Sequence, residues 1–212
     1  MKHFSSKDLP TLDKRFRTML INSLSGFKSV NLVGTTNEEG IHNLSVISSV
    51  VHLGANPALM GFVMRPITVT RDTYLNIMEN GVYTLNHLNG DIYQQAHQAS
   101  ARYASYTSEF DAVGLTPAFK DAFKAPYVKE STIQIGLIFK EKIDIQLNGT
   151  VFIIGEIQEI YVPEDCIHAD GYIDIQKAGT IACSGLDAYH TGNKLKRLSY
   201  AKTDRPVKAM DF

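Results

Sequence analysis

The clearest pattern in the chain is an alternation of apolar and polar positions in its second half. Over residues 133–147, apolar side chains fall on nearly every second position, with a bend expected near 140–142; this spacing is typical of a strand with one buried face. Asn148 and Gly149 follow, a pair that tolerates the positive φ of a tight turn. Residues 151–157 repeat the alternation, so the pattern predicts two antiparallel strands joined by a hairpin.

Short strands and short helices alternate in the first half. Helical spacing of apolar residues marks three segments, and apolar runs or alternations mark the strands. Repeated strand–helix units of a parallel sheet are not evident, so we expect a mainly β fold, a closed or nearly closed antiparallel barrel with peripheral helices, in one domain over residues 1–212. The predicted helices are 12–27, 70–80 and 91–101, and the predicted strands are 30–36, 58–64, 82–86 and one beginning near Asn43.

Composition narrows the possible classes of protein. The chain has 212 residues, 44% of them hydrophobic, and a net charge of −1, so we expect one large core and no nucleic-acid partner. No window reaches the roughly 18 apolar residues that a membrane span requires, and the N-terminus carries no signal-peptide pattern. Cys166 and Cys183 are the only cysteines, which favours a reducing compartment and predicts a cytoplasmic protein.

Familiar catalytic motifs are missing. The sequence contains no G-x-G-x-x-G, no P-loop, no H-E-x-x-H and no G-x-S-x-G. Cys166 and His168 stand two apart, but no second such pair exists, so no metal site is expected. We therefore predict no catalytic side chain.

Several polar residues lie on or beside the strand predicted to begin near Asn43. Asn43, Ser45, Ser48 and Ser49 are bracketed by apolar neighbours, which indicates that the segment is largely buried. A buried hydroxyl without a partner costs about 1–3 kcal/mol, so either the backbone or a polar ligand must satisfy these groups. A solvated strand face is the alternative interpretation.

A second polar group surrounds the start of the helix predicted at 70–80. Arg65, Thr68, Thr70 and Arg71 lie just before it. Free N–H groups at a helix start, threonine hydroxyls and arginine forks together can hold a phosphate. The alternative is two surface arginines beside a helix that Thr70 caps.

Two further candidates lie later in the chain. Asn86 ends the strand predicted at 82–86, and Ser108 belongs to a polar and aromatic segment at 100–111. This segment could cover a planar ring by stacking and amide hydrogen bonds, or it could be an ordinary polar loop.

The order and spacing of several short motifs resemble those of the flavin reductase-like family, over roughly residues 25–200. Each motif is weak, but their order together is fairly specific. The motifs are Asn43-x-Ser45-x-x-Ser48-Ser49, Asn56-Pro57, Arg65-Pro66 with Arg71-Asp72-Thr73, Asn76-Ile77, Tyr83–Asn86, Ser108–Asp111, Gly114–Thr116, Gly155–Ile157 and Gly185–Tyr189.

The resemblance implies the FMN-binding split-barrel fold, a homodimer with flavin near the interface, and reduction of FMN by NADH or NADPH. It implies that the strand residues Asn43, Ser45, Ser48 and Ser49 line the flavin. Arg65, Thr68, Thr70 and Arg71 would hold the phosphate, with Asn86 and Ser108 near the ring.

One departure concerns the ring pocket. Many relatives place an aromatic residue after the serine pair, where this chain has Val50 and Val51. Three other functions fit similar features: a non-catalytic flavin carrier or redox sensor, an enzyme like pyridoxamine-phosphate oxidase, and a barrel that binds an oligonucleotide or oligosaccharide. The acidic balance argues against a nucleic acid, so a small-molecule substrate is expected.

Overall fold

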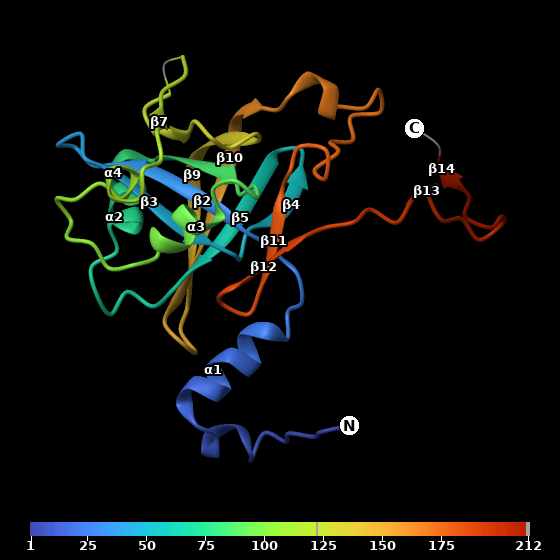
Figure 1. Cartoon of the computed structure of the whole chain (residues 1–212), viewed down its shortest axis with the longest axis horizontal. Helices are drawn as coiled ribbons and strands as arrows, with labels where there is room; N and C mark the ends of the chain where they lie inside the picture. Colours follow the sequence, from blue (N-terminus) through green and yellow to red (C-terminus); the bar gives the residue numbers. More distant parts are fainter. Residues whose placement is uncertain (122, 211–212) are drawn as a thin grey trace.

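A seven-stranded antiparallel sheet forms the centre of the computed structural model, which describes residues 1–121 and 123–210 (Figure 1). The strand order is β3-β2-β6-β9-β10-β5-β4, and each neighbouring pair is antiparallel. The strands are β2 (Asn31–Thr36), β3 (His42–Ile47), β4 (Val51–Ala55), β5 (Ala58–Met64), β6 (Val82–His87), β9 (Gln134–Ile145) and β10 (Thr150–Tyr161).

The barrel is split between the first and last strands of this order. β3 and β4 follow one another in the sequence, yet no ladder joins them within the described part of the chain. Just before β4, the Ser49 hydroxyl accepts a hydrogen bond from Val63 N at 3.0 Å and donates one to Val63 O at 3.1 Å. The first ladder pair of β4 and β5 is Val51 with Gly61, so Ser49 stands opposite Val63 in the same register. Its hydroxyl therefore takes the place of the backbone groups that would continue the ladder. The predicted mainly β, antiparallel split barrel is confirmed.

Two apolar clusters hold the sheet together, one on each side of it. β3 contributes to both, because successive side chains of a strand point to opposite faces. Ile47 packs inside the barrel, whereas Leu44 packs against α3 and α4 outside it. Full burial of one such side chain is worth about 1.5–3 kcal/mol, so both faces of β3 are firmly held. The inner cluster includes Val33, Phe62, Ile77, Tyr83, Leu137 and Ile153, and the outer one Leu32, Leu88, Phe110, Val128 and Ile181.

The helix predicted at 70–80 is observed as α2 (Asp72–Asn80). It ends where Gly81 adopts a φ of 67°, a left-handed conformation that glycine takes without strain. Its buried residue Ile77 joins the inner cluster, so α2 packs against β2 and β3. Arg71, not Thr70, occupies the N-cap position, and its side chain makes no capping bond. The alternative in which Thr70 caps this helix is therefore wrong.

The β9–β10 hairpin shows both the success and the limit of the alternation pattern. Its register shifts between Ile154 and Gly155, opposite Glu141 and Phe139, which agrees with the bend expected at 140–142. The turn is longer than a two-residue hairpin, because Ile145 pairs with Thr150. Only Gly149 takes a positive φ, of 73°, whereas the side chain of Asn148 accepts hydrogen bonds from Thr150.

Smaller elements surround the barrel. The helices expected at 12–27 and 91–101 are shorter than predicted, and α4 was not predicted. They are α1 (Lys14–Ser23), α3 (Tyr93–Gln98) and α4 (Glu109–Val113), with 3-10 turns at Leu9–Thr11 and Glu164–Cys166; the short strands are β1 (Lys28–Ser29), β7 (Pro117–Ala118), β8 (Tyr127–Val128), β11 (Ile181–Ser184), β12 (Ala188–Thr191), β13 (Arg197–Leu198) and β14 (Ala209–Met210).

Two segments project from the barrel: α1 on one side and the C-terminal hairpin of β13 and β14 on another (Figure 1). All ten residues of α1 are described, and none of them is buried. Phe16 is 51% exposed, and Leu24, which follows the helix as its C-cap, is 73% exposed, so part of the apolar side of this helix stays uncovered in the single chain. Among the described helices, none combines the length and apolar character needed to cross a membrane.

Candidate functional site

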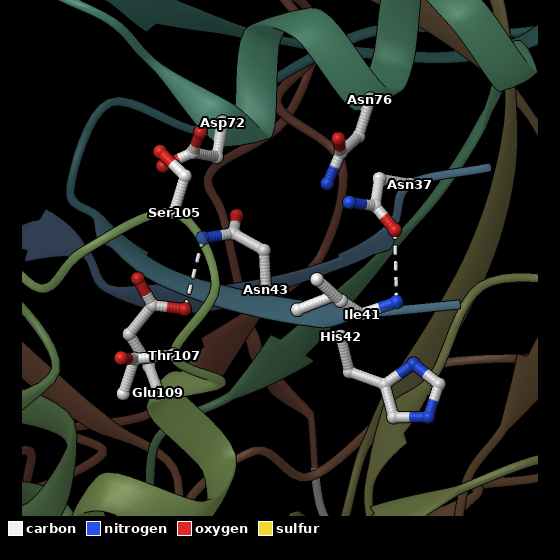
Figure 2. A pocket seen from close by; sticks show the side chains of 9 residues that line it. All are labelled: Asn37, Ile41, His42, Asn43, Asp72, Asn76, Ser105, Thr107 and Glu109. Atoms are coloured by element: carbon white, nitrogen blue, oxygen red, sulfur yellow. Dashed lines mark hydrogen bonds between the residues drawn. The ribbon is translucent and has the colours of Figure 1, made fainter. Parts of the chain in front are cut away.

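A small polar cavity marks the corner where β3, α2 and the segment before α4 meet (Figure 2). Its volume of about 50 Å³ suits water-sized molecules and is far too small for a nucleotide. A nucleotide therefore could not enter this cavity. The lining residues are Asn37, Ile41, His42, Asn43, Asp72, Asn76, Ser105, Thr107 and Glu109.

Asn43 connects this corner to α4. Its Nδ2 donates a hydrogen bond of 2.9 Å to Glu109 Oε2, and the backbone N–H of Leu44 donates to the same oxygen at 3.0 Å (Figure 2). Both side chains are buried, at 8% and 9% exposure. A carboxylate that accepts two N–H groups satisfies donors that would otherwise be costly to bury, so Glu109 fixes the start of β3.

Two hydroxyl groups approach the other end of the Asn43 amide. Thr73 donates to Asn43 Oδ1 at 2.7 Å, and Thr35 donates to it at 3.2 Å. Thr73 Oγ1 also lies 2.9 Å from Ser45 Oγ. Asn76 of α2 donates to Thr35 at 3.0 Å. We call Asn43, Ser45, Thr73 and Glu109 the β3 network; it joins β3 to the first turn of α2 and to α4.

The surroundings of the buried acid in this corner shift its pKa upward, against the hydrogen bonds that it accepts. Burial raises the pKa of Glu109, and the nearby Asp72 carboxylate raises it further, while the hydrogen bonds from Leu44 and Asn43 oppose this shift. Burial likewise lowers the pKa of His42, with Asp111 acting in the opposite direction. The described lining residues include no lysine or arginine, so the corner itself offers no permanent positive charge to a phosphate.

Two serines follow β3 at the split of the barrel. The Ser49 hydroxyl is committed to Val63, so its role is visible within the chain itself. Ser48 is half-buried, and among the described residues its hydroxyl has no hydrogen-bond partner. Of this serine pair, Ser48 is the one free to meet a ligand.

The loop formed by residues 65–71 connects β5 to α2 and carries the predicted phosphate group. Arg65, Thr68 and Thr70 are exposed, and no described residue makes a hydrogen bond or ion pair with their side chains. Arg71 is half-buried, and its Nε is buried without a partner among the described residues. The loop thus gathers unpaired donors at the N-terminus of a nine-residue helix, where the helix dipole also favours an anion.

The last two predicted residues lie in different surroundings. Asn86 is 0% exposed; its Nδ2 donates to Leu32 O and Thr84 Oγ1, and its Oδ1 accepts from Val128 N. These contacts leave no exposed atom for a ligand. Ser108 occupies the N-cap position of α4, and its Oγ is buried without a partner in the described part of the chain.

Prediction from sequence did not select Glu109 or Thr73, although both belong to quoted motifs. Glu109 and Asn43 are 66 positions apart, and periodicity carries no information about such a contact.

Among residues 1–121 and 123–210, no three His, Cys, Asp or Glu side chains come together as a possible metal site.

The antiparallel sheet, open between β3 and β4, and the helices packed around it define the class of split-barrel proteins. Comparison with known proteins is more specific: the flavin reductase like domain matches residues 24–178, and the chain belongs to this family.

Solved structures support the same assignment. A crystal structure from Shewanella frigidimarina, provisionally named a flavin reductase with split barrel domain, is 52% identical, with a TM-score of 0.92; the match covers 95% of this chain and 100% of that one. Nitrilotriacetate monooxygenase component B from Bacillus cereus is 20% identical over 93% and 98% of the two chains, with a TM-score of 0.80, and shows the shared fold. An uncharacterised Aquifex aeolicus protein is 22% identical over 50% of this chain, and the match spans only 55% of that curated relative.

Proposed function

We propose that this protein is an FMN-dependent oxidoreductase that reduces flavin with NADH or NADPH. The observation that carries the proposal is the 65–71 loop, where unpaired arginine and threonine donors meet the N-terminus of α2 beside the β3 network. Membership of the flavin reductase-like family supports a flavin as the ligand. Reduction by a nicotinamide nucleotide, and the onward transfer of electrons to an acceptor, are both part of the proposal.

The donor set of this loop fits a phosphate monoester. Arg65 and Arg71 supply charged N–H groups, and Thr68 and Thr70 supply hydroxyls, which together suit the tail of FMN. The buried, unpaired Nε of Arg71 is a donor that a bound anion would satisfy.

The polar groups nearer the split would face the rest of the cofactor. Ser45 and Ser48 lie on or just after β3, and Ser108 has an unpaired buried hydroxyl. Asn43 would act through the β3 network, since its amide is already bound to Glu109 and Thr73. Ser49 would act through its support of the split, since its hydroxyl already binds Val63. Asn86 is left out of the proposed site because its amide is fully enclosed.

A bound flavin supplies the redox chemistry itself, accepting and passing on a hydride equivalent. The residues of this chain bind and orient it, and no side chain is assigned a proton transfer or a covalent step. The rigid β3 network would hold one side of the site in place before the ligand arrives, which lowers the ordering cost of binding.

We further propose a homodimer with the flavin near the interface. The two projecting segments support it, since Leu24 and Phe27 at the end of α1 are exposed, as are Leu195 and Tyr200 near the C-terminus. Exposed apolar side chains in such numbers favour a protein interface. Sedimentation equilibrium should give twice the mass of one chain, and a monomer at micromolar concentration would contradict this part of the proposal. The two free, buried cysteines agree with a cytoplasmic location.

The deciding experiment is a visible absorption spectrum of the purified protein after incubation with FMN and gel filtration. Retained flavin bands that bleach on anaerobic addition of NADH or NADPH, with repeated turnover when oxygen is admitted, are the expected result. Retained flavin that is reduced slowly and does not turn over would indicate a carrier or sensor instead. Failure to retain any flavin would refute the proposal.

A further inference from the structure

The direction of the hydrogen bonds in the β3 network determines whether Ser45 can donate or accept a hydrogen bond toward a ligand. The inference drawn from it rests on the proposed flavin site. The chain of contacts begins at Glu109, whose Oε2 receives the N–H of Leu44 and the Nδ2 of Asn43. A carboxylate accepts hydrogen bonds and cannot donate them. The amide of Asn43 must therefore present its nitrogen to Glu109 and its oxygen to α2.

The amide orientation is supported from the opposite side. Asn76 donates its Nδ2 hydrogen to Thr35 Oγ1 at 3.0 Å, so the single hydroxyl hydrogen of Thr35 remains available for Asn43 Oδ1, 3.2 Å away. Two hydroxyls, those of Thr35 and Thr73, thus converge on one amide oxygen, which is an acceptor with two lone pairs.

Thr73 has one hydroxyl hydrogen and two close oxygen neighbours. Asn43 Oδ1, at 2.7 Å, can only accept, so it takes that hydrogen. The contact of 2.9 Å between Thr73 Oγ1 and Ser45 Oγ then requires the hydrogen of Ser45. The Ser45 hydroxyl consequently points its hydrogen into the protein and keeps its lone pairs for whatever lies outside.

We propose that Glu109 is a positioning residue which, through Asn43 and Thr73, holds Ser45 as a hydrogen-bond acceptor for the cofactor. The group that Ser45 recognises must then be a donor. On a flavin mononucleotide the donors are the N3–H of the ring and the hydroxyls of the ribityl chain, whereas the phosphate oxygens are acceptors at neutral pH. Ser45 therefore accepts a hydrogen bond from the ring edge or from the ribityl chain, and the 65–71 loop binds the phosphate.

The test measures the dissociation constant by flavin fluorescence quenching for FMN and for analogues that each lack one donor. The analogues are 3-methyl-FMN and the 2′-, 3′- and 4′-deoxy forms, which distinguish the ring from the chain. In the wild type, one analogue should bind about 2- to 10-fold more weakly than FMN, the range of one neutral hydrogen bond. Ser45→Ala should weaken FMN by a similar factor and remove the penalty for that analogue.

The positioning role is tested by the same penalty in three further variants. Thr73→Val keeps the shape of the side chain but removes the hydroxyl that links Asn43 to Ser45. Glu109→Leu removes the carboxylate that orients the Asn43 amide. Both variants should reduce the penalty to less than about twofold. Glu109→Gln retains an acceptor for Leu44 and Asn43 and should keep the penalty. A purely structural role would weaken every ligand by the same factor and leave the ratio unchanged.

The outcomes separate the two proposals. If the wild type binds FMN but shows no penalty with any analogue, or if Thr73→Val leaves the penalty intact, the inference about Ser45 and Glu109 is wrong and the flavin function stands. If the wild type binds neither FMN nor the analogues, the proposed function fails and the inference fails with it. Should Glu109→Leu not fold, Thr73→Val and Glu109→Gln decide the question.

Discussion

The β3 network and the 65–71 loop contain polar residues in comparable numbers, yet their surroundings differ sharply. In the network, every hydroxyl and amide of Asn43, Ser45 and Thr73 meets another group of the same chain. In the loop, the side chains of Arg65 and Thr68 have no such partner among the described residues. Apart from the outward lone pairs of Ser45, the first region is complete without a ligand, and the second is not.

This difference separates support from recognition. A network satisfied within the protein contributes to stability and keeps the strand rigid, because breaking it would leave buried groups unpaired. Exposed arginines contribute little to folding, and they gain energy only when an anion arrives. Substitutions of Asn43, Thr73 or Glu109 should therefore act mainly on stability and only through Ser45 on binding, whereas substitutions in the loop should act on flavin binding alone.

The largest expected effect comes from the centre of the network. Asn43→Ala removes the donor to Glu109 and the acceptor for Thr35 and Thr73, so it should lower the free energy of unfolding by about 3 kcal/mol, the cost of leaving buried polar groups unpaired. Urea denaturation of the flavin-free protein measures this loss. Asn80→Ala, which removes an exposed hydrogen bond to Thr36 O, is the matched control and should cost about 0.5 kcal/mol. Equal losses in the two variants would contradict the comparison.

The next effect should appear in binding alone. Arg65→Ala should weaken FMN by roughly 1.5–3 kcal/mol, the range of one hydrogen bond to a charged group, with unfolding changed by less than about 0.5 kcal/mol. Fluorescence quenching reports the affinity, and riboflavin, which lacks the phosphate, should bind both forms equally. Lys129→Ala removes an exposed positive charge elsewhere and serves as the control. An unchanged affinity for FMN would remove Arg65 from the site.

Ser49 tests a case between the two regions. Ser49→Ala deletes the hydroxyl that bridges to both backbone groups of Val63, at 3.0 and 3.1 Å. We expect a loss of about 1 kcal/mol in stability, because the split end of the barrel is partly open to water and solvent can replace the lost contacts. Thermal unfolding with and without FMN would show whether bound flavin compensates for the change; a stability equal to that of the wild type would contradict the bridging role.

The smallest effect concerns pH. The pKa of Glu109 in the folded protein is raised above its ordinary value of 4.5 by burial, so the folded state holds this proton more tightly than the unfolded chain. Its contribution to stability is full below that pH and declines as the pH rises above it. Glu109→Gln should flatten this decline in urea unfolding measured from about pH 4 to about pH 7. A slope identical to that of the wild type would show that Glu109 does not titrate in this range.

The sequence predicted local elements well and distant contacts poorly. The alternation over residues 133–147 predicted β9, including the irregularity near Lys140, because a strand with one buried face imposes its own period. The bounds predicted for β5, residues 58–64, also agree with the structure. These features depend on neighbours along the chain, which the sequence contains directly.

The site was predictable only in part, for a physical reason. A helix near residues 70–80 could be predicted with the help of Asp72 and Gly81, so the polar segment at its start could be singled out. Whether a polar side chain is satisfied depends on partners far away in the sequence: Asn86 meets Leu32 and Val128, and Asn43 meets Glu109. Nothing in the local pattern distinguishes an amide enclosed in this way from one that faces a ligand.

The split between β3 and β4 has a consequence for motion. A fully closed barrel has no free edge, whereas here two edges meet with one serine side chain bridging from the connection onto β5. Backbone amides beside this opening should exchange their hydrogens with solvent sooner than those of β6 and β9, which have paired strands on both sides. A cofactor bound across the opening would slow that exchange. The rate of amide exchange at these edges would therefore report both the local opening of the barrel and the fraction of protein with cofactor bound.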